Sequence, residues 1–245
     1  MSEIRYDGKV AIVTGAGNGL GRCHALALAA RGAKVVVNDL GGARDGSGGS
    51  LSAAETVVKE ITDAGGEAIA DGANVTDEAQ VDAMVAAAME KWGRVDILVN
   101  NAGILRDKTF HKMDFADYRM VIDVHLIGTA LCSHKVWPIM RDQNYGRIVC
   151  TSSPSGLHGI FGQANYGAAK AAMIGLMNAL HLEGAKYNIR TNLLSPSAKT
   201  RMTTDIGIPD QILEQLTPEA ITAALLFLVG EEAPSRSIIS CAGGG

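Results

Sequence analysis

Residues 9–21, KVAIVTGAGNGLG, combine a short apolar strand with a glycine-rich turn and the start of a helix. Glycine lets the backbone turn sharply and approach a ligand, and a helix N-terminus offers N–H groups and a positive dipole end. A turn in this context is typical of a site for a dinucleotide pyrophosphate. Its candidate contacts are Gly15, Asn18, Gly19 and Leu20. The alternative is an ordinary strand-to-helix turn; a P-loop would require a following Gly-Lys-Ser/Thr, which this turn does not have.

Short apolar strands alternate with helical patterns along the chain. Strands are predicted at residues 9–14, 33–39, 67–70, 94–99, 147–151, 189–194 and 237–241. Helices are predicted from the glycine turn to residue 31 and at 53–64, 76–92 (capped by Thr76), 114–121, 126–141, 164–187, 209–215 and 218–229. This rhythm favours an α/β fold, a Rossmann doubly wound parallel seven-stranded sheet with helices on both faces. Since no linker or repeat divides residues 1–245, we expect a single domain.

Two further strand ends carry candidate cofactor contacts. Asp39 ends the second strand about 20 residues after the glycine turn, where an acid can bind both ribose hydroxyls of an adenosine and would repel a 2′-phosphate. It therefore favours NAD over NADP, although a loop or capping aspartate is the alternative and Arg44 nearby would weaken the discrimination. The fourth strand ends in Asn-Asn-Ala-Gly, residues 100–103, whose small residues leave room for a cofactor. Asn101, Ala102 and Gly103 are candidate contacts, and Asn100 is equally suited to bracing the strand ends.

An acid/base set follows in the second half of the chain. Tyr166 and Lys170 are four residues apart on a predicted helix and so lie on one face. A free tyrosine has a pKa of about 10, which a nearby ammonium lowers. Ser153 precedes the tyrosine and would hydrogen-bond the oxygen that gains or loses the proton. The set suits a carbinol or carbonyl substrate, whereas the alternative is one exposed tyrosine and one solvated lysine.

The composition excludes several classes of protein. The formal net charge of −4 gives no basic face for nucleic acid. The four cysteines have no metal-like spacing, and no metal is expected. No apolar run reaches transmembrane length, and the polar start does not resemble a signal peptide, so we expect no membrane partner and a cytoplasmic location.

Four motifs together resemble the short-chain dehydrogenase/reductase family over almost the whole chain. They are the Thr-Gly-x-x-x-Gly-x-Gly turn from Thr14, the Asn-Asn-Ala-Gly run, Ser153 with Tyr166 and Lys170, and Ser195-Pro196 after the sixth strand. The resemblance implies that Tyr166 is the acid/base, that Lys170 holds the nicotinamide ribose and lowers the tyrosine pKa, and that Ser153 steadies the substrate oxygen. It also implies further cofactor contacts: Asn74, Val75, Tyr166, Lys170 and Pro196.

The chain departs from the family pattern at three positions. His125 stands where many members place an asparagine that holds a proton-relay water, so it is a candidate catalytic residue or a packed core histidine. Asn74 replaces an aspartate near the adenine, and its carbonyl oxygen would still accept from the adenine amino group. Ser197-Ala198 follows Pro196 where glycine is usual.

A narrower resemblance indicates the substrate. Residues 38–46, 101–108, 143–148 and 201–203 resemble the dehydrogenase domain of the type 2 multifunctional enzyme of peroxisomal β-oxidation, a subgroup that also has histidine at the position of His125. This implies NAD-dependent interconversion of (3R)-3-hydroxyacyl-CoA and 3-oxoacyl-CoA. The alternatives are a 17β-hydroxysteroid dehydrogenase, a 3-oxoacyl-carrier-protein reductase, which normally prefers NADP, and a catalytically silent NAD-binding regulator.

Other segments bear on substrate and assembly. The basic residues after the fourth strand either meet coenzyme A phosphates or form a solvated face: Arg106, Lys108, His111 and Lys112. The family places its substrate lid between Pro196 and Pro218, where this chain has apolar residues suited to an acyl chain or a steroid: Met202, Ile206, Ile208, Ile212 and Leu213. The helix that carries Tyr166 has more apolar surface than one sheet face needs. The resemblance implies that this helix and its predecessor pair across a two-fold axis, so a homodimer or homotetramer is expected.

Overall fold

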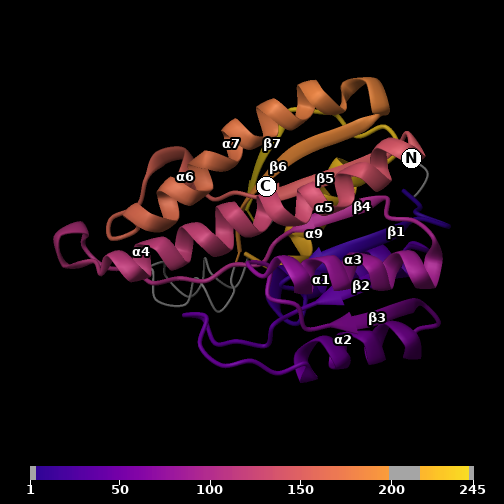
Figure 1. Cartoon of the computed structure of the whole chain (residues 1–245), viewed down its shortest axis with the longest axis horizontal. Coiled ribbons are helices and arrows are strands. Elements are labelled where there is room, and N and C mark those ends of the chain that lie inside the picture. Colours follow the sequence, from indigo (N-terminus) through magenta and orange to yellow (C-terminus); the bar gives the residue numbers. More distant parts are fainter. Residues whose placement is uncertain (1–3, 199–215, 243–245) are drawn as a thin grey trace.

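A computed structural model describes residues 4–198 and 216–242. The described strands form one parallel sheet in the order β3-β2-β1-β4-β5-β6-β7 (Figure 1). Their bounds are β1 Val10–Thr14, β2 Lys34–Asn38, β3 Glu67–Asp71, β4 Ile97–Asn100, β5 Gly146–Thr151, β6 Ile189–Ser197 and β7 Ile238–Ala242. The order reverses between β1 and β4, which creates the crevice where ligands bind in such sheets. The predicted doubly wound Rossmann architecture is confirmed.

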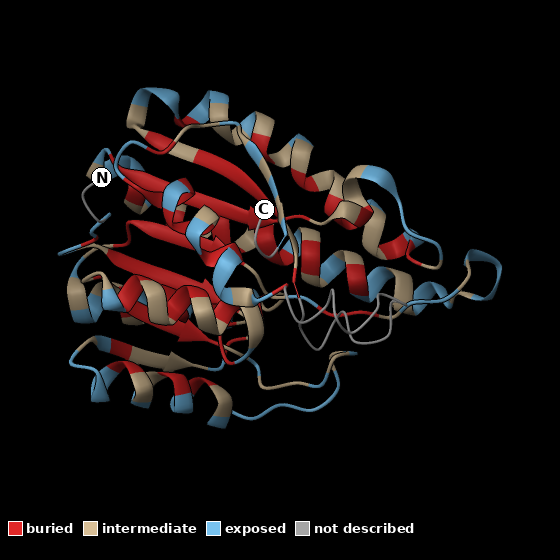
Figure 2. Ribbon diagram, turned by 180° about the vertical axis from the view of Figure 1, so that it is seen from behind, coloured by how far each residue is buried: buried red, intermediate tan, exposed pale blue. Residues whose placement is uncertain are grey.

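Helices cover both faces of the sheet. They are α1 Gly19–Ala30, α2 Ser52–Asp63, α3 Glu78–Trp92, α4 Phe115–Ile122, α5 Gly128–Gln143, α6 Pro154–His158, α7 Ala164–Gly184 and α9 Pro218–Val229, with short turns η1 Phe110–Lys112, η2 Asp123–Ile127 and η3 Ala185–Tyr187. β1 shows how the sheet separates two apolar cores: Ala11 and Val13 belong to the core with α1, α2 and α9, and Val10 and Ile12 to the core with α3, α5 and α7. Figure 2 shows the central strands buried between these layers, whereas the edge strands β3 and β7 are partly exposed.

The structure corrects two predictions about local elements. The cap of α3 is Asp77, not Thr76, because Asp77 has the extended backbone of a cap and its side chain accepts from the Gln80 N–H at 3.1 Å. The helices predicted at 114–121 and 126–141 are one continuous run through residue 143, joined by the π-helical turn η2. Such turns insert a residue without breaking the helix and often occur at functional sites. The predicted helix at 209–215 lies outside the described residues.

Candidate active site

The glycine turn lies directly against the end of β4. Gly15 has a φ of +63°, and a Cβ added to it would stand 2.8 Å from Cα of Ala102. The Asn101 amide donates to the carbonyl oxygens of Thr14 and Gly15 at 3.1 and 3.0 Å. Only glycine fits this left-handed position in such close contact. Asn101 therefore holds the turn in place by bridging the ends of β1 and β4.

The start of α1 presents backbone groups toward solvent. Asn18 is its N-cap and is exposed, and its side chain makes no capping hydrogen bond. Gly19, the first residue of the helix, has a φ of +52°. The N–H groups of the first turn are therefore available to an anion.

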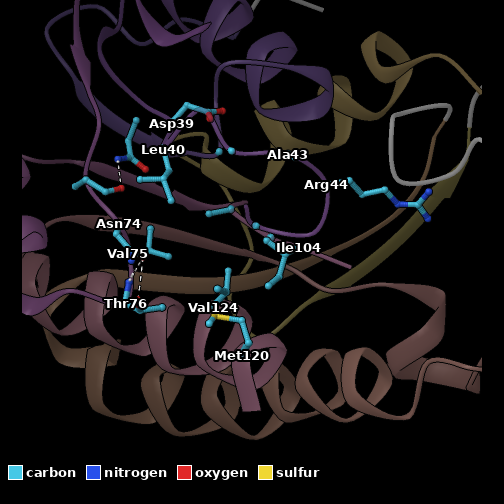
Figure 3. A pocket seen from close by; sticks show the side chains of 17 residues that line it. Asp39, Leu40, Ala43, Arg44, Asn74, Val75, Thr76, Ile104, Met120 and Val124 are labelled. Atoms are coloured by element: carbon cyan, nitrogen blue, oxygen red, sulfur yellow. Dashed lines mark hydrogen bonds between the residues drawn. The ribbon is translucent and has the colours of Figure 1, made fainter. Parts of the chain in front are cut away.

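A cavity opens beside this turn (Figure 3). The predicted cofactor contacts that line it are Gly15, Asp39, Asn74, Val75, Ala102 and Gly103. Asp39 accepts from the N–H groups of Gly17 and Gly41, each at 2.7 Å, through its two different oxygens. Each oxygen keeps one acceptor site, enough for two ribose hydroxyls. Arg44 extends away from Asp39 in Figure 3.

Asn74 is engaged differently from the prediction. Its side-chain oxygen accepts from the N–H and the hydroxyl of Thr76 at 3.0 and 2.9 Å. A carbonyl oxygen has two acceptor sites, so an adenine amino group would have to displace one of these bonds. Asn74 lines the cavity but has no spare acceptor in this arrangement.

A second cavity adjoins the first, and Gly103 lines both. The predicted site residues that line it are Leu20, Asn101, Gly103, His125, Ser153, Tyr166, Lys170 and Pro196. They come from distant parts of the chain: η2, the end of β5, α7 and the end of β6. The carboxyl ends of parallel strands meet at one edge of the sheet, and this edge gathers the predicted catalytic groups.

Lys170 is almost fully buried, and burial lowers its pKa from 10.5 to about 7. Its ammonium nitrogen donates to the Thr151 carbonyl at 2.5 Å and lies 5.5 Å from the centre of the Tyr166 ring. Burial raises the pKa of Tyr166 to about 12, and a hydrogen bond with the Ser153 hydroxyl opposes that rise. The predicted lowering of the tyrosine pKa by Lys170 is therefore wrong for this structure, because desolvation of the phenolate dominates.

His125 faces the same cavity with a buried ring. Its Nε2 lies 3.1 Å from the Ile104 nitrogen and 2.8 Å from the Ile104 oxygen, so it either accepts from one or donates to the other. Nδ1 has no hydrogen-bond partner among the described residues. Burial, then the charge of Lys170, hold the pKa of His125 well below 6.5, so the ring is neutral. Its environment accommodates both neutral tautomers, and Nδ1 can present either a proton or a lone pair.

The His125 ring packs between two other site residues. It lies edge-on to the Tyr166 ring with centres 5.0 Å apart. A Cβ added to Gly103 would stand 2.3 Å from its Cε1. The glycine of the Asn-Asn-Ala-Gly run thus makes room for His125 as well as for a cofactor. This contact could not be predicted from the sequence, because it joins residues from different elements.

Sequence reasoning also missed two residues that hold the start of α7. Asn165 is fully buried; its amide donates to the Arg106 carbonyl at 3.0 Å and its oxygen accepts from the Tyr166 N–H at 2.8 Å. Gln163 donates to the Asp107 carboxylate at 2.8 Å. The available signal was the position of Asn165, one residue before the tyrosine and in the first turn of a helix.

Residues 4–198 and 216–242 contain neither a candidate metal site nor a helix suited to cross a membrane. No group of three or more histidine, cysteine, aspartate or glutamate side chains is arranged to hold a metal ion there. None of the helices in that part of the chain combines the length and apolar character needed to cross a bilayer.

Comparison with known proteins identifies the family. The short chain dehydrogenase family model matches residues 9–210. A putative short-chain type dehydrogenase/reductase of Mycobacterium tuberculosis is 51% identical over 97% of this chain and 82% of its own length. Peroxisomal multifunctional enzyme type 2 of Drosophila melanogaster is 52% identical over 94% of this chain, which spans only 38% of that enzyme.

A solved structure of 7α-hydroxysteroid dehydrogenase, complexed with NADH and 7-oxo glycochenodeoxycholic acid, superimposes with a TM-score of 0.88 at 33% identity. The match covers 98% of this chain and 95% of that one. With the glycine turn, the two adjoining cavities and the Ser-Tyr-Lys set in place, these likenesses lead to one conclusion: the chain belongs to the short-chain dehydrogenase family.

Proposed function

We propose that this dehydrogenase interconverts (3R)-3-hydroxyacyl-CoA and 3-oxoacyl-CoA with NAD. One observation carries the proposal: Ser153, Tyr166 and Lys170 line one cavity that adjoins the cavity beside the glycine turn. The likeness to the multifunctional enzyme type 2 supports the acyl-CoA substrate.

The residues present fit a nicotinamide dinucleotide. The glycine turn and Asp39 would hold the adenosine half, and Lys170 and Tyr166 the nicotinamide ribose. When bound, the nicotinamide exchanges a hydride with the carbon that carries the substrate oxygen. Tyr166 exchanges the proton at that oxygen, and the Ser153 hydroxyl donates a hydrogen bond to it. Since burial favours the protonated phenol, Tyr166 is poised as a proton donor in the reducing direction.

Asp39 supports NAD as the cofactor. Its carboxylate lies in the nucleotide cavity with acceptor sites left for two hydroxyls, and a 2′-phosphate there would meet a negative charge. Arg44 lines the same cavity, but its side chain extends away from Asp39 rather than beside the carboxylate.

The surface beside the catalytic cavity supports a coenzyme A ester. Lys108, His111 and Lys112 are exposed, and no ion pair holds them among the described residues. The Lys108 N–H donates to the Gly162 carbonyl, which places this segment next to the rim formed by Ile160 and Gln163. Arg106 differs, because its guanidinium binds Asp117. We therefore assign the coenzyme A phosphates to the ammonium groups of Lys108 and Lys112 and to the imidazole of His111.

A hydroxysteroid is the second candidate substrate. The structural likeness to a 7α-hydroxysteroid dehydrogenase at a TM-score of 0.88 favours it.

Exchanging both Lys108 and Lys112 for glutamate separates the acyl-CoA candidate from the hydroxysteroid candidate. For a 3-oxoacyl-CoA substrate the KM should rise about tenfold, while it should stay unchanged for the matching pantetheine thioester, which has no phosphates. Lys91→Glu, an exposed charge reversal on α3, is the control. Turnover of 17-keto steroids but not of acyl-CoA esters would refute the acyl-CoA proposal.

The basic test of the chemistry is Tyr166→Phe. Without the Tyr166 hydroxyl, no side chain supplies the proton that the substrate oxygen must receive. Turnover of 3-oxoacyl-CoA with NADH should therefore fall by at least about a hundredfold. NADH binding, followed by fluorescence, should survive. Wild-type rates in this variant would remove Tyr166 from the chemistry, and NADH binding by a wild type that turns over no substrate would favour a silent regulator.

A further inference from the structure

Residues 104–108 connect the loop at residues 42–46, beside the proposed nucleotide cavity, to α7, the helix that carries Tyr166. On one side, the Leu105 N–H donates to the Arg44 carbonyl at 3.0 Å and the Arg106 Nε donates to the Asp45 carbonyl at 2.8 Å. Residues 42–46 of that loop include Gly42, Arg44 and Gly46, which line the nucleotide cavity. Residues 104–108 are therefore hydrogen-bonded to the loop that forms one wall of the proposed cofactor cavity.

On its other side the same segment holds the start of α7. The Arg106 carbonyl accepts from the buried Asn165 amide at 3.0 Å, and Asn165 in turn accepts from the Tyr166 N–H. The Asp107 carboxylate accepts from Gln163 at 2.8 Å, and the Lys108 N–H donates to Gly162 at 2.9 Å. These bonds set where α7 begins and hence where its tyrosine stands.

Arg106 is the residue common to both sides. Its guanidinium binds the Asp45 carbonyl and, through Nη1, the Asp117 carboxylate of α4 at 2.7 Å, while its own carbonyl binds Asn165. Arginine suits this role because its planar fork can donate to two acceptors at once, which lysine cannot do with the same geometry. The side chain is 26% exposed, and its bond to Asp117 is partly buried whereas its bond to Asp45 is exposed.

We propose that Arg106 is a positioning residue that couples dinucleotide binding at the 42–46 loop to the placement of Tyr166. Ordering of that loop by the dinucleotide stabilises the Arg106 bonds, and these stabilise the start of α7. The inference rests on the proposed cofactor site but not on the acyl-CoA substrate.

Arg106→Met tests the coupling by two readouts. NADH should bind about three- to tenfold more weakly, and kcat should fall about ten- to a hundredfold, because a displacement of about 1 Å at a catalytic group can cost a hundredfold. NADH should slow the hydrogen exchange of the backbone amides of residues 159–167 in the wild type but not in the variant. A residue with a merely structural role would lower the melting temperature without removing this ligand-dependent protection.

Two further variants keep the test decisive. Arg119→Met, an exposed arginine on the same helix as Asp117, should retain wild-type protection. Asp117→Asn removes only the carboxylate partner and should show an intermediate loss, which also serves if Arg106→Met does not fold. If NADH protects residues 159–167 equally in the wild type, Arg106→Met and Asp117→Asn, the coupling is refuted. That result would leave the proposed cofactor standing. If the wild type binds no dinucleotide, the proposed cofactor fails and the coupling fails with it.

Discussion

Replacing Lys170 by methionine should stabilise the fold near neutral pH while removing activity. The ammonium is almost fully buried, and its pKa falls from 10.5 to about 7. One pKa unit corresponds to about 1.4 kcal/mol. At pH 7 the unfolded chain holds this proton and the native state holds it about half the time, so the buried lysine costs roughly 4 kcal/mol.

Removal of Lys170 has an opposing cost. The Thr151 carbonyl loses its donor, and an unsatisfied buried acceptor costs about 1–3 kcal/mol. The net expectation for Lys170→Met is therefore a gain of about 1–3 kcal/mol in the free energy of unfolding at pH 7. Turnover should be lost, because Lys170 is proposed to hold the cofactor ribose.

The pH dependence gives a sharper test. Because the native pKa is depressed, the native state releases the proton near pH 7 and the unfolded chain keeps it to about pH 10.5. The unfolded state then binds more protons, so this group makes stability rise with pH by up to about 1.4 kcal/mol per unit. Urea unfolding of wild type and Lys170→Met from about pH 7 to about pH 8, below the cysteine range, measures the difference.

The difference between the two stability curves should shrink as the pH rises. Lys91→Met, an exposed position on α3, controls for the loss of one charge. Parallel curves, or a Lys170→Met protein that is less stable than wild type at pH 7, would refute the reasoning that desolvation dominates at this lysine.

Three other changes test separate contacts. Gly103→Ala should cost about 1–3 kcal/mol, because the new methyl stands 2.3 Å from the His125 ring; adding His125→Asn should recover part of it, and an equal loss in both backgrounds contradicts the clash. Asp39→Ser should weaken NADH binding about tenfold and shift preference toward NADPH, since hydrogen bonds to charged groups are worth about 1.5–3 kcal/mol; a fluorescence titration with an unchanged NADH/NADPH ratio contradicts this. Ser153→Ala should move the pH profile of alcohol oxidation upward, because the Ser153 hydrogen bond lowers the Tyr166 pKa; an unmoved profile contradicts it.

The sequence predicted the sheet and most of the site for a geometric reason. In a parallel sheet the strand ends meet at one edge, so motifs such as the glycine turn, Asp39 and Ser153 converge once the strands are placed. Local choices were less predictable. Thr76 and Asp77 are both good caps, and the backbone conformation decides between them. The π turn at η2 adds one residue to a helix, which an apolar period of about 3.6 cannot reveal.

Electrostatics were the least predictable part, because charge signs are visible in a sequence and burial is not. Spacing puts Lys170 one turn from Tyr166 and predicts that its charge lowers the tyrosine pKa. In the structure both groups are desolvated, and desolvation moves the two pKa values in opposite directions, each toward the neutral form.

The opposite shifts of the Lys170 and Tyr166 pKa values affect how the proposed site would work. In the proposed mechanism, a cavity that favours the neutral forms of Tyr166 and Lys170 would hold a proton on the phenol for delivery to the substrate oxygen, and it would oppose release of that proton in the oxidising direction. The Ser153 hydroxyl is the described group whose hydrogen bond favours the phenolate. In the proposed mechanism we therefore expect Ser153 to do more than orient the substrate: by stabilising the charged form of Tyr166 it would set how far above neutral pH the oxidising direction must operate, and a bound positive charge beside the phenol would act in the same sense.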